Sequence, residues 1–138
     1  MDPVVHFEMP AEDKKRMIKF YESVFGWQTQ QLGPEFGDYV VVTTTETDEN
    51  QMIKTPGNIN GGFYEKQPTD THGQHPRIVI AVEDIRASMK RVEAAGGKII
   101  GGGFQAGEPD DIPGVGLYIS VLDPEGNEVA LLQPVSRA

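Results

Sequence analysis

The feature that most constrains how this chain folds is a repeat of one strand and one helix. Residues 4–27 and 76–99 each run from a short alternating pattern into an amphipathic helix that ends at glycine. An offset of 71 positions aligns the two segments. It pairs Glu12 with Glu83, Asp13 with Asp84, Lys15 with Arg86, Lys19 with Lys90, Glu22 with Glu93, Gly26 with Gly97 and His6 with Arg77. We therefore interpret the chain as a duplicated unit.

Three further strands follow the helix in each copy, so the sequence predicts an α+β fold of two tandem βαβββ modules. The first copy has expected strands at Val4–Met9, Trp27–Leu32, Tyr39–Thr44 and Ile59–Tyr64. The second has them at Arg77–Val82, Lys98–Ile100, Val115–Leu122 and Glu128–Gln133. We predict one domain over residues 1–138, with modules at 1–65 and 76–138 joined by a polar linker at 66–75.

Strand alternation gives the first strand of each module one face toward its helix and one polar face. The strand residues expected to meet the helices are Val5, Phe7 and Met9, and Ile78, Ile80 and Val82. The helix residues expected to meet them are Met17, Phe20, Tyr21 and Val24, and Ile85, Ser88, Met89, Val92 and Ala95. The opposite strand faces carry Val4, His6 and Glu8, and Arg77, Val79 and Ala81. We expect these faces to curve into one open cleft, with His6 near Arg77.

Composition excludes several classes of partner and chemistry. The formal charge is −9, from 12 Lys+Arg against 21 Asp+Glu, which disfavours binding to nucleic acid. No apolar run approaches the ~20 residues that span a bilayer, and the N-terminus has no secretory pattern, so we expect no membrane partner and a cytoplasmic location. Cysteine is absent, which removes disulfides, thiolate ligands and cysteine nucleophiles.

Three stretches carry a resemblance to a known family: FEMPAEDKKRMIKFYESVFGW, RIVIAVEDIRASMKRVEAAGGKI and DIPGVGLYISVLDPEGNEVALLQP. In their order and spacing the chain resembles the vicinal oxygen chelate superfamily of glyoxalases, bleomycin-resistance proteins and extradiol dioxygenases. It looks most like the single-domain subgroup related to lactoylglutathione lyase. The resemblance implies paired βαβββ modules, a common cleft and a homodimer, but no single reaction, because this fold hosts many.

The resemblance also implies where a metal would bind. The family's metal enzymes place one ligand on the first and last strand of each half. These positions fall on His6, Gly61, Arg77 and Ala130, and only His6 has the usual type of side chain. A guanidinium at Arg77 repels a cation, so we expect no metal cofactor. His75 or Glu128 would need a two-residue displacement, and an improvised site of His6, Glu8 and Glu128 is the remaining alternative.

The candidate ligand-binding residues lie on the polar strand faces and are His6, Glu8, Arg77, Tyr118 and Ser120. His6, Glu8 and Arg77 are also the candidates for catalysis, whereas the plainer interpretations are a hydrogen-bonded lining histidine and a Glu8–Arg77 salt bridge. His72 and His75 are interpreted as linker residues. The glycine-rich loop Gly101–Gly114 is long enough to form a lid, and its acidic residues are expected to keep it solvated.

Two functions of different classes remain open. The first is a glyoxalase-related protein that binds an unidentified small organic ligand in the cleft and has lost the metal tetrad. The second is an isomerase, lyase or epimerase acting next to a carbonyl, either metal-free or with a divergent metal site. In a metal-free enzyme His6 or Glu8 would remove the proton, and Arg77 would stabilise the enolate oxygen.

Overall fold

The computed structural model describes residues 1–68 and 73–135, so His72 of the expected linker lies outside the described residues. The chain forms two compact units, which are described separately below. One is residues 6–76, here called the N-terminal module. The other, here called the C-terminal module, is residues 77–138 together with residues 1–5. Within the C-terminal module the N–H of Ala81 donates to the carbonyl of Pro3 at 2.9 Å, which ties the first residues to that unit.

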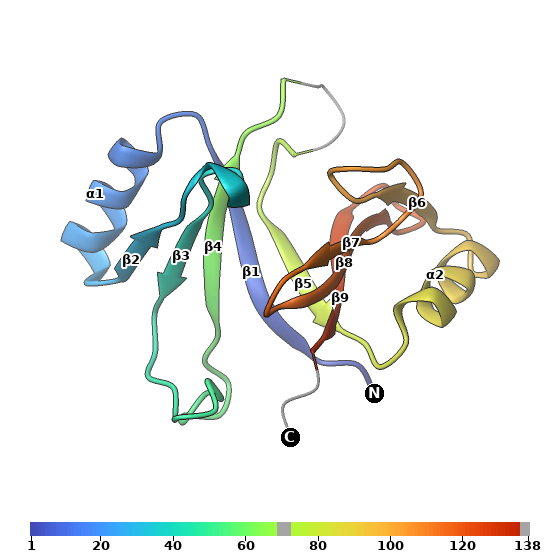
Figure 1. Ribbon diagram of the computed structural model, residues 1–138, viewed down its shortest axis with the longest axis horizontal. Coiled ribbons are helices and arrows are strands. Elements are labelled where there is room, and N and C mark those ends of the chain that lie inside the picture. Colours follow the sequence, from blue (N-terminus) through green and yellow to red (C-terminus); the bar gives the residue numbers. More distant parts are fainter. Residues whose placement is uncertain (69–72, 136–138) are drawn as a thin grey trace. The chain divides into compact units, whose positions relative to one another are not determined.

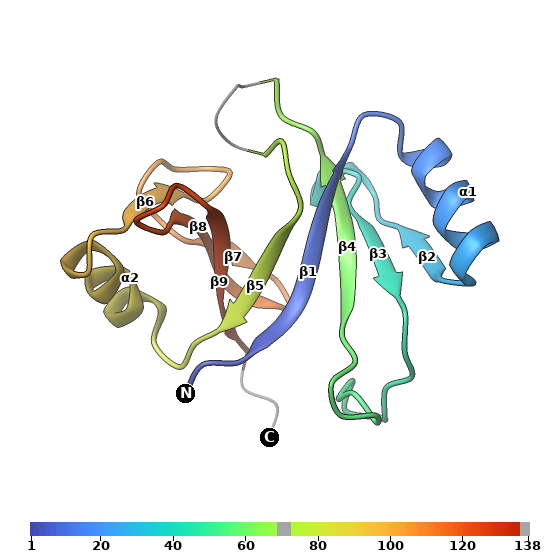
Figure 2. The same cartoon turned by 180° about the vertical axis from the view of Figure 1, so that it is seen from behind.

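The N-terminal module has the predicted βαβββ order, with one short 3₁₀ turn added (Figure 1). Its elements are β1 (Val4–Ala11), α1 (Lys14–Phe25), β2 (Gln28–Gln31), η1 (Pro34–Phe36), β3 (Val40–Thr43) and β4 (Asn60–Glu65). The strands are ordered β2-β3-β4-β1, with β1 parallel to β4 and the other pairs antiparallel. α1 lies beside this sheet in both views (Figures 1 and 2).

The core of the N-terminal module is aromatic. Val40, Val42 and Phe63 are fully buried. Partly buried side chains pack around them from β1, α1 and the residue before β2, namely Phe7, Met9, Met17, Ile18, Tyr21 and Trp27. The Tyr21 and Trp27 rings stack with centroids 4.7 Å apart. The predicted inward faces of Phe7, Met9, Met17 and Tyr21 are therefore confirmed.

Three residues predicted to face that core do not. Phe20 and Val24 are more than half exposed, because α1 directs Met17, Ile18 and Tyr21 at the sheet and these two residues lie beside that stripe. Val5 is exposed as well, because the pairing of β1 with β4 begins one residue later, at His6. The predicted helix stripe was therefore right for Met17 and Tyr21 and wrong for Phe20 and Val24.

The C-terminal module repeats the arrangement. Its elements are β5 (Arg77–Ala81), α2 (Ile85–Ala94), β6 (Lys98–Gly101), β7 (Asp110–Ile112), β8 (Gly116–Leu122) and β9 (Glu128–Pro134). The strand order is β5-β9-β8-β6, with β5 parallel to β9 and β7 paired to β8 (Figure 2). The strands of the N-terminal module have the same order, β1-β4-β3-β2, so β5, β9, β8 and β6 take the places of β1, β4, β3 and β2. The duplication seen in the sequence is therefore also a duplication of topology.

The core of the C-terminal module is aliphatic, formed by Val82, Ile85, Ile119, Val121 and Leu131. Ile80, Met89 and Val92 pack against it, as predicted. Two residues of β5 depart from the expected alternation. Ile78 is 42% exposed although it was assigned to the helix side, and Val79 is 1% exposed although it was assigned to the open side. Val79 pairs with Ala130 on the central strand β9, where the far face of the sheet is also buried.

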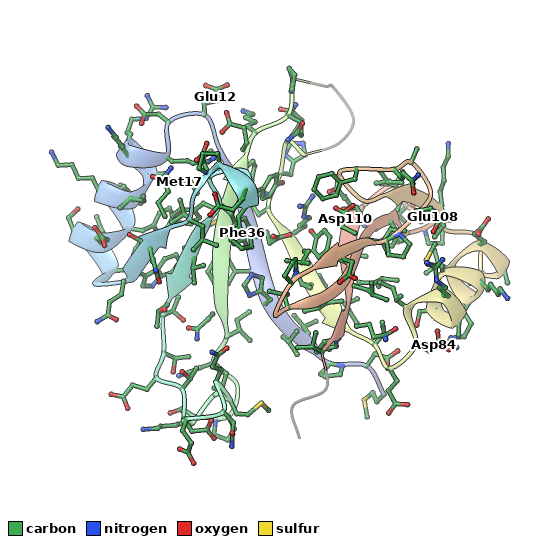
Figure 3. The ribbon with its side chains drawn as sticks, viewed as in Figure 1. Glu12, Met17, Phe36, Asp84, Glu108 and Asp110 are labelled. Carbon is green, nitrogen blue, oxygen red and sulfur yellow. The ribbon has the colours of Figure 1, made fainter. Side chains whose placement is uncertain are left out.

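The glycine-rich loop after β6 contains a short strand that the sequence did not predict. Part of it forms β7, which pairs with β8. The Asp110 carboxylate accepts hydrogen bonds from the N–H groups of Gly103 (2.6 Å) and Phe104 (3.2 Å). Glu108 forms an ion pair with Arg86 at 3.0 Å, and both acidic residues are labelled on this loop in Figure 3. These acids hold the loop in shape, whereas we had expected them only to solvate it.

Aspartates cap the starts of both helices. Asp13 accepts from the N–H of Arg16 at 3.0 Å, and Asp84 accepts from the N–H of Ala87 at 3.1 Å. At the other end Gly26 adopts φ +72° after α1, whereas after α2 the left-handed residue is Gly96. Of the described residues, no helix is long and apolar enough to cross a membrane.

Candidate functional site

A hydrogen-bonded triad of His6, Tyr39 and Glu8 lies on the N-terminal module. His6 Nε2 lies 3.0 Å from the Tyr39 hydroxyl, and that hydroxyl donates to Glu8 Oε2 at 2.9 Å. The Glu8 side chain is buried, and His6 and Tyr39 are half-buried. One hydroxyl thus joins the two polar side chains that the sequence placed on a single strand face.

Strand alternation explains how these residues come together. His6 and Glu8 are two residues apart on β1, so they share the face opposite Phe7 and Met9. Tyr39 comes one residue before β3. Its side chain therefore points to the opposite face of the sheet from that of the buried Val40. The triad therefore lies on the side of the sheet away from α1.

Gly62 makes the triad possible. It pairs with Glu8 on β1 and with Val41 on β3. A Cβ atom at this position would lie 1.9 Å from the Tyr39 hydroxyl oxygen, well inside contact distance. The missing side chain is therefore the space that the Tyr39 hydroxyl fills, which is one of the recognised uses of glycine within a strand.

The neighbouring Gly61 does not belong to this face, and our assignment of it to a family ligand position was wrong. Gly61 pairs with Phe7, and a Cβ atom on it would meet the Phe7 ring at 2.5 Å on the helix side. The position on the His6 side is Gly62. The error was a one-residue slip in a short strand, which turns a side chain to the other face.

The environment of His6 favours its neutral form. Burial lowers the pKa of His6 below its ordinary value of 6.5, and the nearby charge of Glu8 opposes this shift without cancelling it. At neutral pH the imidazole therefore carries one proton and one lone pair. Such a ring can accept a hydrogen bond or a proton.

The C-terminal module holds a different polar group on its corresponding face. Arg77 on β5 pairs with Glu128 on β9, and both side chains are mostly buried, at 12% and 14% exposed. The guanidinium carbon also lies 5.9 Å from the centre of the Tyr118 ring, a cation–π arrangement. Three residues from three strands are thus brought together: Arg77, Tyr118 and Glu128. Ser120, which we also predicted as a ligand contact, is buried at 8% exposed and pairs with Ala130.

Strand registers show which positions in the two modules are equivalent. Glu8 pairs with Gly62, and Gly62 with Val41. In the second module Val79 pairs with Ala130, and Ala130 with Ser120. Stepping two residues along these strands gives the full set of equivalents: His6 with Arg77, Glu8 with Val79, Asn60 with Glu128, Gly62 with Ala130, and Tyr39 with Tyr118.

The residues at the family's metal-ligand positions do not fit a divalent cation. The N-terminal module supplies His6 and Gly62, and the only donor, His6, has its Nε2 bonded to Tyr39. The C-terminal module supplies Ala130, which has no donor, and Arg77, a cation already paired with Glu128. Within residues 1–68 and 73–135, no three His, Asp or Glu side chains are grouped as ligands would be.

A hollow of about 440 Å³ lies elsewhere in the N-terminal module, at the start of α1. Its walls include Pro10, Ala11, Glu12, Arg16, Met17 and Phe20. Glu12 and Met17 are labelled in Figure 3. None of the predicted site residues lines this hollow, so it is separate from the triad.

Tyr39 is the residue that the sequence analysis missed. It was included in a strand but not considered as part of the site. Two signals could have identified it. Its parity opposes that of Val40 and Val42, and the glycine pair in the next strand indicates that another group approaches closely.

Comparison with curated proteins gives relatives named as glyoxylases. The chain is 27% identical over 127 residues to "Putative glyoxylase CFP32" of Mycobacterium tuberculosis, covering 92% of this chain and 42% of that protein. It is 29% identical to the "Glyoxylase-like domain-containing protein" of Didymella fabae, covering 90% of this chain and 88% of that one. The chain thus spans less than half the length of the mycobacterial relative.

Comparison with solved structures identifies the same fold. A hypothetical protein from Bacillus halodurans aligns with a TM-score of 0.66 at 14% identity, covering 99% of this chain and 97% of that one. A Streptomyces coelicolor methylmalonyl-CoA epimerase variant aligns with a TM-score of 0.65 at 14% identity, over 96% and 97% of the two chains. The Glyoxalase/Bleomycin resistance protein/Dioxygenase superfamily model matches residues 4–131. The chain therefore belongs to the Glyoxalase/Bleomycin resistance protein/Dioxygenase superfamily.

Proposed function

We propose that this protein binds a small organic molecule through hydrogen bonds to His6, Glu8 and Tyr39, and that it does so without a divalent metal. The observation that carries the proposal is the bond between His6 Nε2 and the Tyr39 hydroxyl. This bond uses the imidazole of His6, the one side chain at the family's ligand positions that could ligate a metal. At the second ligand position, Gly62 has no side chain, and the Tyr39 hydroxyl fills the space.

The chemistry of the triad favours an oxygen-bearing ligand. A neutral imidazole, a hydroxyl and a carboxylate provide both donors and acceptors, which suit hydroxyl, carbonyl and carboxyl groups. Arg77 and Tyr118 form a separate candidate contact on the C-terminal module, where an arginine beside an aromatic ring suits an anionic or planar group. Ser120 is another candidate on that module, and its burial is similar to that of Glu8.

A second candidate is an isomerase, lyase or epimerase that acts next to a carbonyl. The lowered pKa of His6 favours it, because a neutral imidazole at physiological pH is able to take up a proton. Solved proteins with this fold include ones named methylmalonyl-CoA epimerase, although a likeness at 14% identity carries the fold and not the reaction.

A thermal-shift screen of the tag-free protein separates these candidates. The probes are 2-oxo acids, 2-hydroxy acids, acyl thioesters and catechols. A probe at 100 times its dissociation constant stabilises the folded state by about 2.7 kcal/mol, which raises the melting temperature by several degrees. Binding without turnover supports the first function, and turnover that is lost in His6→Ala supports the second.

The controls test the site and the metal. His6→Ala should abolish the shift, whereas His75→Ala should leave it unchanged, because His75 is exposed. Elemental analysis of the same protein should show less than one tenth of an equivalent of nickel, zinc, iron or manganese, an order-of-magnitude bound for an unligated site. A stoichiometric metal that is lost together with His6 would overturn the metal-free proposal.

A further inference from the structure

The hydrogen bonds of the triad determine which ring nitrogen of His6 carries the proton and which carries the lone pair. We propose that Tyr39 is a positioning residue that fixes His6 as the Nε2–H tautomer, so that Nδ1 carries the lone pair and selects ligands that donate a hydrogen bond. The ligand-selection part rests on the proposed function, whereas the tautomer is a property of the free protein.

Counting protons on the triad gives the tautomer. A carboxylate has no proton to donate, so Glu8 can only accept from Tyr39. The phenol has a single proton, and that proton is used in the bond to Glu8. Toward His6 the same oxygen must therefore act as an acceptor, and the atom that lies 3.0 Å from it, Nε2, must be the donor. A neutral ring with its proton on Nε2 has its lone pair on Nδ1.

The fold holds this geometry in place from several sides. Glu8 is 5% exposed, so leaving it without its hydroxyl partner would cost the desolvation of a buried carboxylate. The Tyr39 hydroxyl lies in the space that Gly62 leaves open. His6 stands next to Glu8 on the same face of β1, so one hydroxyl reaches both. Burial lowers the pKa of His6, which favours the neutral ring, the form for which a tautomer is defined.

The tautomer sets the class of ligand. An Nδ1 lone pair accepts from O–H and N–H groups and offers nothing to an ether oxygen or a fully ionised carboxylate. The chemical class that fits is a small molecule with a hydroxyl, enol or acid O–H group. The methyl ether of the same molecule should bind at least about tenfold more weakly, since it leaves Nδ1 without a partner.

Long-range ¹H–¹⁵N correlation spectra of the full chain, labelled at histidine, measure the tautomer directly. At about pH 7.5 the wild-type protein should show His6 as one tautomer, with the proton on Nε2 and in slow exchange with water. In Tyr39→Phe that proton should exchange rapidly, and both nitrogen shifts should move toward the average of the two tautomers. An Nδ1–H tautomer in the wild type, or an unchanged spectrum in Tyr39→Phe, would overturn the assignment.

Two further variants separate positioning from a general loss of structure. Gly62→Ala keeps the tyrosine but fills the space of its hydroxyl, so it should reproduce the Tyr39→Phe spectrum. Tyr21→Phe removes a hydroxyl in the same module whose bond to Met9 Sδ is long, at 3.9 Å, and should leave the His6 signals unchanged. A Gly62→Ala spectrum identical to that of the wild type would contradict the proposal.

Ligand selection is tested by titrating lactate and 2-methoxypropionate into the same sample. The Nδ1 shift should respond to lactate and respond at least about tenfold more weakly to its methyl ether. Equal responses, or none with either probe, would overturn the ligand class. A single Nε2–H tautomer in a protein that binds nothing in the thermal-shift screen would refute the proposed function and leave the tautomer assignment standing.

Discussion

The two modules share one backbone plan and use its equivalent positions for different chemistry. In the N-terminal module a histidine, a carboxylate and a tyrosine form a triad in which the imidazole is neutral. At the equivalents of His6 and Glu8, the C-terminal module has Arg77 and Val79. Arg77 is satisfied by an ion pair with Glu128, whose own equivalent in the first module is Asn60. Topology survives such changes because it is set by strand pairing and helix packing.

The equivalent tyrosines show how one position takes two roles. The Tyr39 hydroxyl bonds to His6 and Glu8, while the Tyr118 ring lies 5.9 Å from the Arg77 guanidinium. Gly62, which leaves room for the Tyr39 hydroxyl, corresponds to Ala130 in the second module, and the two residues differ by a single methyl group. The small residue in the central strand is therefore what allows a hydroxyl to enter the triad in one module.

The largest expected effect tests the contrast between the two cores. Phe63→Ala removes a fully buried ring from the aromatic core and should lower the free energy of unfolding by about 4 kcal/mol. Ile119→Ala in the aliphatic core should cost about 3 kcal/mol, because it removes fewer atoms. Urea unfolding followed by circular dichroism measures both variants, and a loss below about 1 kcal/mol for Phe63→Ala would contradict the assigned core.

The second prediction concerns the ion pair that distinguishes the C-terminal module. Glu128→Leu removes a carboxylate partner of the mostly buried Arg77 guanidinium, so it should destabilise the protein by roughly 3 kcal/mol. The double variant Arg77→Met with Glu128→Leu should recover most of that loss. The matched control is Glu108→Leu in the exposed pair with Arg86, which should cost less than about 1 kcal/mol. Similar losses for Glu128→Leu and Glu108→Leu would show that the first pair is not effectively buried.

The third prediction uses a feature that the modules have in common. Asp13→Ala and Asp84→Ala each remove a carboxylate that accepts a backbone N–H at the start of a helix, so each should cost about 1 kcal/mol. The Asn variants at the same positions should retain most of the stability, since an amide oxygen also caps. Thermal unfolding of the four variants measures their loss of stability. If the losses at the two positions differ by more than about 1 kcal/mol, the two caps are not equivalent.

The caps illustrate what the sequence alone could predict. Asp84, the helix that follows it, the βαβββ order of elements along the chain and the family all follow from patterns within a few residues or from the offset between the two copies. The apolar side of α1 could not be chosen in this way, because Phe20 and Tyr21 both suit a core, and only packing against β3 and β4 selects Tyr21. Local periodicity predicts that a helix is amphipathic more reliably than it predicts which of two apolar sides is buried.

The candidate site depended on strand register, which is not a local property. His6 and Glu8 were identified from alternation within one strand. Gly61 was assigned in place of Gly62 because nothing within β4 itself fixes which residue lies on the same sheet face as His6. Tyr39 enters the triad from a neighbouring strand, through the space left by that same glycine. A one-residue error in register thus hid both the correct position and the residue that occupies it.

The smallest expected effect is a pH dependence that should belong to the N-terminal triad. Burial lowers the pKa of His6 in the folded state, so below the ordinary value of 6.5 the unfolded chain binds the proton more readily. The stability due to a neutral His6 is therefore present above pH 6.5 and is lost as the pH falls below it, levelling off once the folded state also binds the proton. Urea midpoints of the wild type and His6→Gln at about pH 8 and about pH 5.5 measure this effect, because the carboxylates titrate in both proteins and their contribution cancels in the difference between the two.

The wild type should lose more stability than His6→Gln over that interval. An equal loss would mean that the imidazole titrates alike in the folded and unfolded chains. The contrast between a neutral His6 in one module and a charged Arg77 at the equivalent position of the other would then not hold.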